Sequence, residues 1–313
     1  MRKVAIESIY QLAKRDPRVV FIGSDLGAGV LEKMRLEMPD RFFMEGVSEQ
    51  AIIGIAAGMA MDGFIPYINT IATFLTRRCF EQLAVDVCMH NLPVRLIASG
   101  GGAVYAPLGP THMALDDLAL LRTLPGMTVV APSDAPEMGR VMDASLDVAG
   151  PLYVRIAKGS DPVISRAELG FTIGRAIVLE EPGEVLFVGT GVMTTRALRA
   201  REVLAERGIT AGVVHAHTVK PLDVDTIAAA AANARLLVTV EEHFRNGGLG
   251  SAVLEGLADR GISMPIVRCG FADAYSYDFG SQDHVLEVAG LQPAGLAATV
   301  ERALSGHAAI AGA

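Results

Sequence analysis

The chain has 313 residues, of which 51% are hydrophobic and 20% are charged, and its formal net charge is −8. This length is sufficient for two compact domains with hydrophobic cores. The negative charge and the lack of a Lys/Arg run argue against nucleic acid as a partner. No stretch of about 18 uninterrupted apolar residues occurs, so the sequence predicts no membrane-spanning segment.

The three cysteines, Cys79, Cys88 and Cys269, form neither a CxxC pair nor a Cys/His ligand spacing. This pattern argues against zinc, iron–sulfur clusters and a disulfide framework, and we predict no metal site. Isolated cysteines are typical of a reducing compartment. The N-terminal segment also lacks the apolar core of a signal peptide. We therefore expect a cytoplasmic protein.

Predicted helices and strands alternate along the first half of the chain. The segment MRKVAIESIYQLAKRD has the apolar spacing of an amphipathic helix. Further helices are predicted at 48–61, with Ser48 as the N-cap, and at 74–90. Strands are predicted at 19–23, 64–71, 94–98, 128–131 and 152–156. This alternation indicates βαβ units and a parallel sheet.

A second pattern of the same kind follows a stretch with weak periodicity. Strands are predicted at 185–189, 211–215, 236–241 and 265–268, with helices at 194–207, 226–234 and 248–260. We therefore predict an α/β protein with two domains, each a mostly parallel sheet flanked by helices. The expected boundaries are 1–160 for the first domain, 161–175 for a linker and 176–313 for the second domain.

Several motifs occur in an order that resembles a known family. The first half contains GVSEQ, followed by AIIGIAAGMAMDG, INTIATFLTRRCFEQ, LPVRLIASGGG, GPTH and LRTLPGMTVVAPSD. The second half contains VGTGVMTTRAL, VVHAHTVKPLD and VEEHFRNGGLGSAVLE. Together they resemble the pyrimidine-binding and C-terminal domains of transketolases, and are similar to deoxyxylulose-phosphate synthases and to the beta subunits of 2-oxo-acid dehydrogenases. The resemblance implies a cofactor, thiamine diphosphate.

Glu49 carries the central chemical expectation. In the family this glutamate hydrogen-bonds a ring nitrogen of the cofactor's aminopyrimidine and thereby activates the cofactor. Such a role requires a carboxyl group near an apolar pocket, where a proton can be shared. The alternative is that Glu49 only favours the dipole of its helix from the first turn. The flanking motif favours the catalytic role.

Aromatic and basic residues after the next predicted strand are expected to complete the cofactor site. The resemblance implies that Phe74 stacks on the aminopyrimidine, although core packing is the alternative. Transketolases carry two more aromatic residues three and six positions later, and here those positions are Arg77 and Phe80. An arginine here is closer to the deoxyxylulose-phosphate synthase pattern, and either Arg77 or its neighbour Arg78 aligns with that position.

Two further candidates lie in or after polar turns. His112 of the GPTH motif matches a family histidine that faces the substrate, so we expect it to exchange protons with a substrate oxygen. Asp25 matches a residue near the pyrimidine edge of the cofactor in transketolases. Its alternative role as an ordinary turn aspartate is equally well supported.

The sequence departs from the transketolase pattern where the substrate would bind. Leu108 replaces an aspartate that reads a substrate hydroxyl, and the loop Gly100–Gly102 lacks the family's basic residue for a sugar phosphate. Arg155 matches a phosphate-binding arginine of the family, with Lys158 nearby. We therefore expect Arg155 and Lys158 to bind substrate, with a donor or acceptor that differs from the usual ketose phosphates.

The sequence contains no GDG motif, with which thiamine enzymes bind the diphosphate through Mg²⁺. The resemblance thus implies an N-terminal transketolase-like partner subunit that carries the Mg²⁺ and diphosphate site. Self-association through the first domain would then give a heterotetramer. Glu241, Glu242 and His243 resemble metal ligands, but adjacent strand residues point to opposite faces, so we expect no metal there.

The expected function is a subunit of a split transketolase that transfers a ketol or acyl unit between carbonyl compounds. The first alternative is the beta subunit of a 2-oxo-acid dehydrogenase's decarboxylating component, which shares the two-domain layout and the missing GDG. The second is a non-catalytic scaffold subunit of the same fold.

Overall fold

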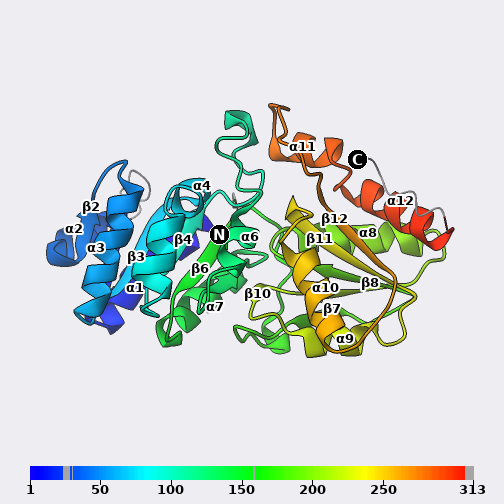
Figure 1. Ribbon diagram of the computed structural model, residues 1–313, viewed down its shortest axis with the longest axis horizontal. Coiled ribbons are helices and arrows are strands. Elements are labelled where there is room, and N and C mark those ends of the chain that lie inside the picture. The colour runs from blue at the N-terminus through cyan, green and yellow to red at the C-terminus, as the bar shows by residue number, and fades with distance from the viewer. Residues whose placement is uncertain (24–28, 30, 158, 307–313) are drawn as a thin grey trace.

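The computed structural model describes residues 1–23, 29, 31–157 and 159–306, and it contains two α/β domains that lie side by side (Figure 1). In the first domain the described strands form a sheet with the order β10-β5-β6-β4-β3-β1-β2, in which every pairing except β10 with β5 is parallel. Its strands are β1 (Val19–Gly23), β2 (Phe42–Met44), β3 (Ile65–Ile71), β4 (Arg95–Ser99), β5 (Thr128–Val130), β6 (Leu152–Ile156) and β10 (Thr218–Lys220).

Helices cover both faces of this sheet because its central strands are apolar on both sides, as in other parallel sheets. The helical elements are α1 (Arg2–Arg15), α2 (Glu32–Glu37), η1 (Pro39–Arg41), α3 (Glu49–Met61), α4 (Ala72–Thr76), α5 (Phe80–Gln82), η2 (Leu83–Cys88), η3 (Ala106–Leu108), α6 (Asp117–Arg122), α7 (Ala135–Ala144) and η4 (Ser145–Asp147). One core includes apolar residues of α1 and α7, and the other includes residues of α3, η2 and α6.

The helix predicted over 74–90 is wrong as a single element. The structure breaks it after Thr76, continues with a turn at 77–79 and the short α5, and ends in η2, a π-helix. A π-helical segment accommodates an extra residue and is frequent at functional sites. The break matters here because Arg77 and Arg78 lie in the turn and take different directions.

The second domain is built around another mostly parallel sheet, with the order β12-β11-β8-β9-β7 and an antiparallel edge strand, β7. Its strands are β7 (Ile177–Glu180), β8 (Val185–Gly189), β9 (Ala211–His215), β11 (Leu236–Phe244) and β12 (Ile266–Phe271). Its helical elements are η5 (Ala167–Leu169), α8 (Met193–Ala205), α9 (Val224–Ala231), α10 (Leu249–Asp259), α11 (Gln282–Val288) and α12 (Pro293–Leu304). None of the described helices is both long enough and apolar enough to cross a membrane.

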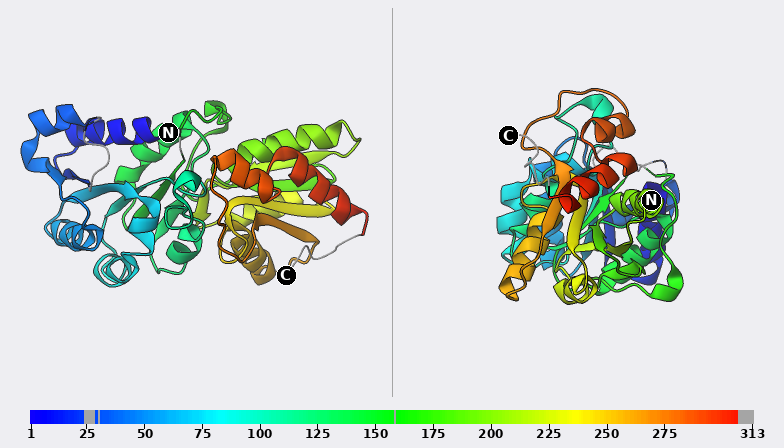
Figure 2. Two further views of the ribbon diagram at one scale, coloured as in Figure 1. Left: turned by 90° about the horizontal axis from the view of Figure 1, so that it is seen from above. Right: turned by 90° about the vertical axis from the view of Figure 1, so that its right-hand side faces the viewer.

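The two domains are joined by more than the linker, because β10 follows β9 in the chain yet pairs with β5 of the first sheet. Figure 2 shows how closely the two halves approach. A buried polar contact crosses the same boundary: Nε2 of His215 lies 2.9 Å from a carboxylate oxygen of Glu137. Within the second domain, Nδ1 of His215 lies 2.7 Å from Oγ1 of Thr194, which fixes the ring. The sequence pattern alone did not predict this exchanged strand.

Candidate active site

Glu49 begins α3 and is buried, with a side chain that is only 2% exposed. The hydroxyl of Ser48 does not cap the helix; it donates instead to the carbonyl oxygen of Glu45 at 2.8 Å. Burial of a carboxylate is unfavourable unless a partner compensates its charge. That partner is Arg78, whose Nη1 donates to Oε2 of Glu49 at 2.5 Å.

Phe74 lies against this ion pair, and His112 lies against Phe74. The guanidinium carbon of Arg78 is 4.1 Å from the centre of the Phe74 ring, a cation–π contact. The ring of His112 meets the Phe74 ring edge-on, with 5.3 Å between centroids and an interplanar angle of 66°. The Nδ1 atom of His112 is 2.9 Å from Oγ1 of Thr111. We call Glu49, Phe74, Arg78 and His112 the Glu49 cluster.

This arrangement brings together three residues that are far apart in the sequence and that the motifs singled out. Glu49 comes from the start of α3, Phe74 from α4, and His112 from the loop between η3 and α6. Arg78 was not predicted as a site residue, because two adjacent arginines cannot be distinguished without knowing where the helix breaks. The cluster combines a buried carboxyl, an aromatic face and an imidazole, which is suited to binding a flat heterocycle and to moving protons.

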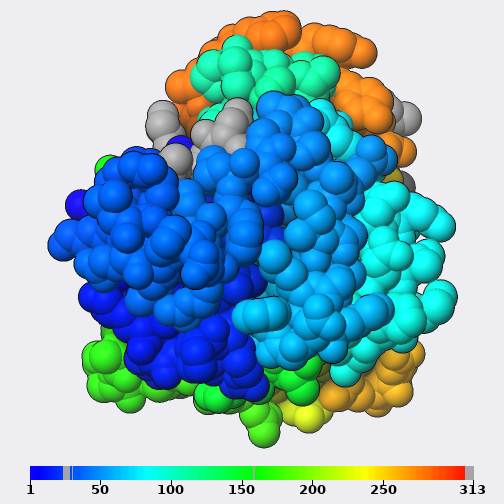
Figure 3. Space-filling view, turned by 90° about the vertical axis from the view of Figure 1, so that its left-hand side faces the viewer, coloured from blue at the N-terminus to red at the C-terminus, as the bar shows by residue number. Residues whose placement is uncertain are grey.

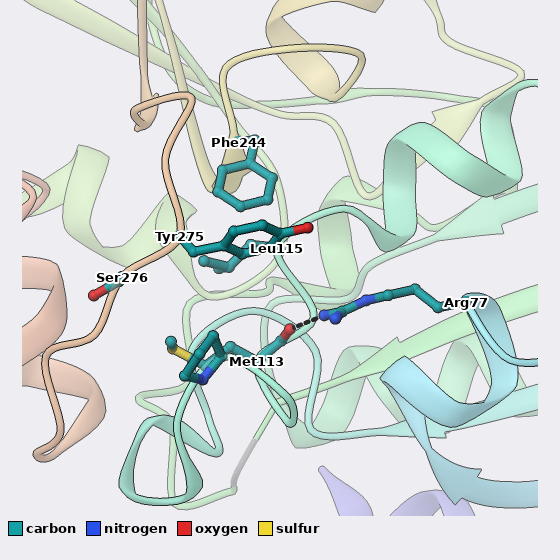
Figure 4. A pocket seen from close by; sticks show the side chains of 7 residues that line it. Arg77, Met113, Leu115, Phe244, Tyr275 and Ser276 are labelled. Atoms are coloured by element: carbon teal, nitrogen blue, oxygen red, sulfur yellow. Dashed lines mark hydrogen bonds between the residues drawn. The ribbon is translucent and has the colours of Figure 1, made fainter.

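Arg77 points away from the Glu49 cluster and toward the second domain. Its Nε lies 3.1 Å from a carboxylate oxygen of Asp116, and its Nη2 donates to the carbonyl oxygen of Met113 at 2.5 Å. Burial raises the pKa of Asp116 despite the arginine beside it. Figure 4 shows Arg77 at the edge of a small pocket between the domains, which is lined by Arg77, Pro110, Met113, Leu115, Phe244, Tyr275 and Ser276.

Phe80 is half-buried at the margin of the core that contains residues of α3 and η2. Its placement fits the packing role that is the ordinary one for an aromatic residue on a short helix. The other predicted cofactor residue, Asp25, lies outside the described residues, as does Lys158.

Arg155 occupies a different environment from the one expected of a substrate ligand. Its side chain is 7% exposed, and its Nε and Nη2 donate to the two carboxylate oxygens of Asp117 at 2.9 and 3.0 Å. Nη2 also donates to the carbonyl oxygens of Ala114 and Glu242, each at 2.8 Å. Nε and Nη2 of Arg155 thus join the two domains, and a phosphate contact, which would have to use Nη1, stays a prediction.

The glycine loop has a packing function in this structure. A Cβ atom at Gly101 would lie 2.3 Å from the side chain of Arg155, and one at Gly102 would lie 2.3 Å from the carboxyl carbon of Glu242. Glycine therefore leaves the room that these two buried side chains require. A larger side chain at position 101 or 102 would therefore collide with Arg155 or Glu242.

Of the three adjacent residues of β11, Glu242 points to one face of the strand, whereas Glu241 and His243 share the other, with 3.8 Å between Oε2 of Glu241 and Nδ1 of His243. Glu241 accepts hydrogen bonds from the backbone of Leu249 and Gly250, and burial raises its pKa to about 7. Glu242 accepts from Ala103 and Gln282, whereas Nε2 of His243 accepts from Ala119. Within the described ranges, no group of three or more His, Cys, Asp or Glu side chains is arranged to hold a metal ion.

Two family patterns match the chain in the same order as the two domains. The pattern described as transketolase, pyrimidine binding domain, matches residues 1–162, which is more than half of the chain. The chain belongs to the transketolase family. The pattern described as transketolase, C-terminal domain, matches residues 174–296. The predicted fold class, two α/β domains with mostly parallel sheets, is confirmed by these matches and by the sheets described above.

Individual relatives of this transketolase-family chain fall into two length classes. A 1-deoxy-D-xylulose-5-phosphate synthase of a Synechococcus species is 39% identical over 94% of the chain, which corresponds to 46% of that enzyme. The chain thus spans about half the length of such curated relatives. A 6-deoxy-6-sulfo-D-fructose transketolase subunit of a Clostridium species is 34% identical, and the match covers 93% of this chain and 90% of that subunit.

Solved structures give the same picture. A chain described as split gene transketolase, inactive beta4 tetramer, superposes with a TM-score of 0.89 and 33% identity, covering 97% of this chain and 98% of that one. A transketolase of Pichia stipitis has a TM-score of 0.77 at 17% identity and covers 98% of this chain but 46% of its own, which supports the fold alone. In these comparisons the chain matches a separate subunit and a split-gene chain over their full length, and longer chains over about half of theirs.

Proposed function

We propose that this chain is one subunit of a split, thiamine-diphosphate-dependent transketolase-like enzyme, which transfers a ketol or acyl unit between carbonyl compounds. The observation that carries the proposal is the Glu49 cluster: a buried carboxylate beside an aromatic face, on a chain that matches a split-gene transketolase from end to end. When bound, thiamine diphosphate supplies the carbanion chemistry of such transfers.

The residues present fit the heterocyclic part of this cofactor. The carboxyl of Glu49 would hold a proton at a ring nitrogen, and the face of Phe74 would fix the plane of the ring. The guanidinium of Arg78 is itself a flat group that bears nitrogen atoms. It both donates to Glu49 and lies over the Phe74 ring, which supports the fit of a heterocycle at the same place. His112, at the edge of Phe74, would exchange protons with an oxygen of the substrate.

The rest of the cofactor must be held by another chain in this proposal, because the sequence has no GDG motif. We assign the diphosphate and Mg²⁺ to an N-terminal transketolase-like partner subunit, so that activity requires both chains. Asp25 and Lys158 remain candidates for contacts to the cofactor and the substrate, respectively. Arg155 is a candidate substrate contact through Nη1 alone in this proposal, since its Nε and Nη2 are bound within the chain.

Self-association is proposed to use one face of the first domain, which we call the α3 face. It comprises Gly54, Ile55, Gly58 and Met61 of α3, with Val47 before the helix and Val85 and Met89 in and after the neighbouring η2. Val47 and Met89 are 70% and 73% exposed. Figure 3 looks onto this end of the molecule, where α3 lies beside η2.

A second copy of this chain is the occupant that we propose for the α3 face. The outward positions of α3 carry no charge, and its two glycines leave open space that lets another backbone approach closely. The split-gene relative that matches end to end is described as a tetramer of one kind of subunit. With the partner subunit added, such a dimer gives a heterotetramer.

The test is to combine the chain with a partner that carries GDG and to assay thiamine-dependent turnover of hydroxypyruvate, pyruvate and ketose phosphates in parallel. Glu49→Gln should lower the rate by about 10²–10⁴, the typical contribution of one general acid–base group. Glu206→Gln, which changes an exposed carboxylate of the second domain, is the matched control. An unchanged rate in Glu49→Gln would reject the catalytic role of Glu49.

A further inference from the structure

We propose that Arg78 holds the heterocycle's place in the unloaded subunit, and that cofactor binding displaces Arg78 in exchange for a proton on Glu49. This inference rests on the proposed function, because it assigns a device to the same site. It differs from the cofactor role expected for Arg77, whose side chain is bound to Asp116 and Met113 instead.

The contacts of Arg78 are those that a bound heterocycle would need. Its guanidinium is flat, lies 4.1 Å from the centre of the Phe74 ring, and directs Nη1 to Oε2 of Glu49 at 2.5 Å. A ring that stacked on this face and bonded this oxygen would occupy the same volume. Arg78 in this position and the heterocycle therefore exclude each other.

Arg78 is positioned to leave, whereas Glu49 is not. The Arg78 side chain is 40% exposed and projects from the turn between α4 and α5, while Glu49 is 2% exposed at the start of a regular helix. An arginine that is partly in water recovers its hydration when it moves outward. A buried carboxylate that loses its cation has no such compensation.

The exchange requires a proton for charge balance. Before binding, the guanidinium cation neutralises the Glu49 carboxylate. A neutral ring nitrogen cannot do so, and an uncompensated buried carboxylate is unfavourable. A proton from solvent therefore forms an O–H bond on Glu49, which then donates to the ring nitrogen, while Arg78 keeps its charge and moves into solvent. No electron transfer and no other covalent change are involved.

Cys79 and the ion pair of Arg77 and Asp116 lie near the site but cannot supply this proton uptake on cofactor binding. Burial raises the pKa of Cys79 to about 12, so this residue remains a thiol. Arg77 and Asp116 form their own ion pair. His112 contacts the Phe74 ring and is the remaining group, so the experiment includes His112→Asn, in which the proton uptake by Glu49 should persist.

The experiment is isothermal titration of the complex with thiamine diphosphate and Mg²⁺, at one pH, in buffers of different ionisation enthalpy. The wild type should take up close to one proton per site. Arg78→Gln should take up less than half as much, because no cation leaves the Glu49 carboxyl when the cofactor binds to this variant, and it should bind the cofactor at least as tightly. Arg260→Gln is the control, since Arg260 is 39% exposed and pairs with Asp225 in the other domain.

The outcomes are distinguishable. If Arg78→Gln binds the cofactor ten times more weakly with unchanged proton uptake, Arg78 is a cofactor ligand and the inference is wrong. If Arg78→Gln fails to fold, Arg78→Lys keeps the charge without the flat face; it should retain the uptake and lose no affinity, and a tenfold loss would again contradict the displacement. Absence of binding in the wild type would reject the proposed function and this inference with it.

Discussion

Arg155 and Asp117 are both nearly inaccessible to solvent, so the charge of each is compensated within the protein by the other. Replacing Arg155 with Met would leave the Asp117 carboxylate buried without a cation. We expect a loss of about 3–5 kcal/mol in the free energy of unfolding, measured by urea denaturation. Arg260→Met removes an exposed pair instead and should cost less than about 1 kcal/mol. A similar small effect in Arg155→Met would contradict the bridging role.

Tyr153 provides a milder probe of the same ion pair. Its hydroxyl donates to Oδ2 of Asp117 at 2.6 Å, and both side chains are fully buried. Tyr153→Phe keeps the ring packing and removes one hydrogen bond to a charged group. We expect about 1.5–3 kcal/mol of destabilisation in the same urea experiment. A variant as stable as the wild type would mean that Asp117 is satisfied by Arg155 alone.

Individual site residues could be predicted where a motif fixed their surroundings. Glu49, Phe74 and His112 stand in recognisable motifs, and the structure brings them together. The internal ion pair of Arg155 could not be predicted, because the sequence shows the charge of Arg155 but not the carboxylate 38 positions earlier that meets it in space. Likewise, the glycines at 100–102 suggested a missing ligand, whereas Gly101 and Gly102 provide room for the buried side chains of Arg155 and Glu242.

At the level of elements, the α3 face leads to a test of association. Ile55 is 39% exposed at its centre, so Ile55→Asp places a charge where a second copy would pack. We expect sedimentation velocity to show a shift from an oligomer toward the 33.0 kDa chain. Leu254→Asp on α10 is the matched control, because Leu254 is 38% exposed and lies in the other domain. Equal masses for Ile55→Asp and the wild type would argue against this interface.

The segment after β9 gives the protein a dependence on pH. Burial lowers the pKa of His217 to about 4, and no described group bonds its Nε2. The folded chain therefore binds fewer protons at this residue than the unfolded chain between about pH 4 and 6.5, so stability falls as the pH falls through this window. Between pH 6.5 and pH 5, His217 should lower the free energy of unfolding by about 1.5 kcal/mol.

This pH effect can be measured by urea unfolding at several pH values. His217→Asn should flatten the dependence between pH 6.5 and 5. Glu241 works in the opposite direction: its raised pKa of about 7 gives stability that is complete below about pH 4.5 and is lost as the pH rises through 7. If the free energy of unfolding of His217→Asn fell between pH 6.5 and 5 as it does in the wild type, this histidine would not be the cause of the loss.

Helices and strands were predicted well where the apolar periodicity is strong. They were predicted poorly where contacts with distant segments determine where an element ends or whether it forms. The strands at 19–23, 152–156, 185–189 and 211–215 coincide with β1, β6, β8 and β9. The predicted helix at 74–90 is broken, since a turn and a π-helix carry no periodic signature that differs from a helix. The short strand β10 was missed because its pairing partner lies about ninety positions earlier in the chain.

For the whole molecule, the shared strand and the buried pairs predict that both domains unfold together. Hydrogen exchange followed by mass spectrometry, with increasing urea, should give one midpoint for peptides from β6 and from β11. The physical reason is that opening the second sheet removes β10 from the first and separates His215 from Glu137. Two well-separated midpoints would mean that the domains are independent units.

The donated strand also limits how this protein can be rearranged. Consider a chimaera that joins the first half of this chain, cut at 161–175, to the second half of a relative. The edge strand β10 of the first sheet would then come from the relative, and β5 would have to pair with it. Whether two halves from different proteins fit together should therefore depend on the few residues of the β5–β10 pairing more than on the sequence of the linker. The topology therefore favours chimaeras in which β5 and β10 come from the same parent protein.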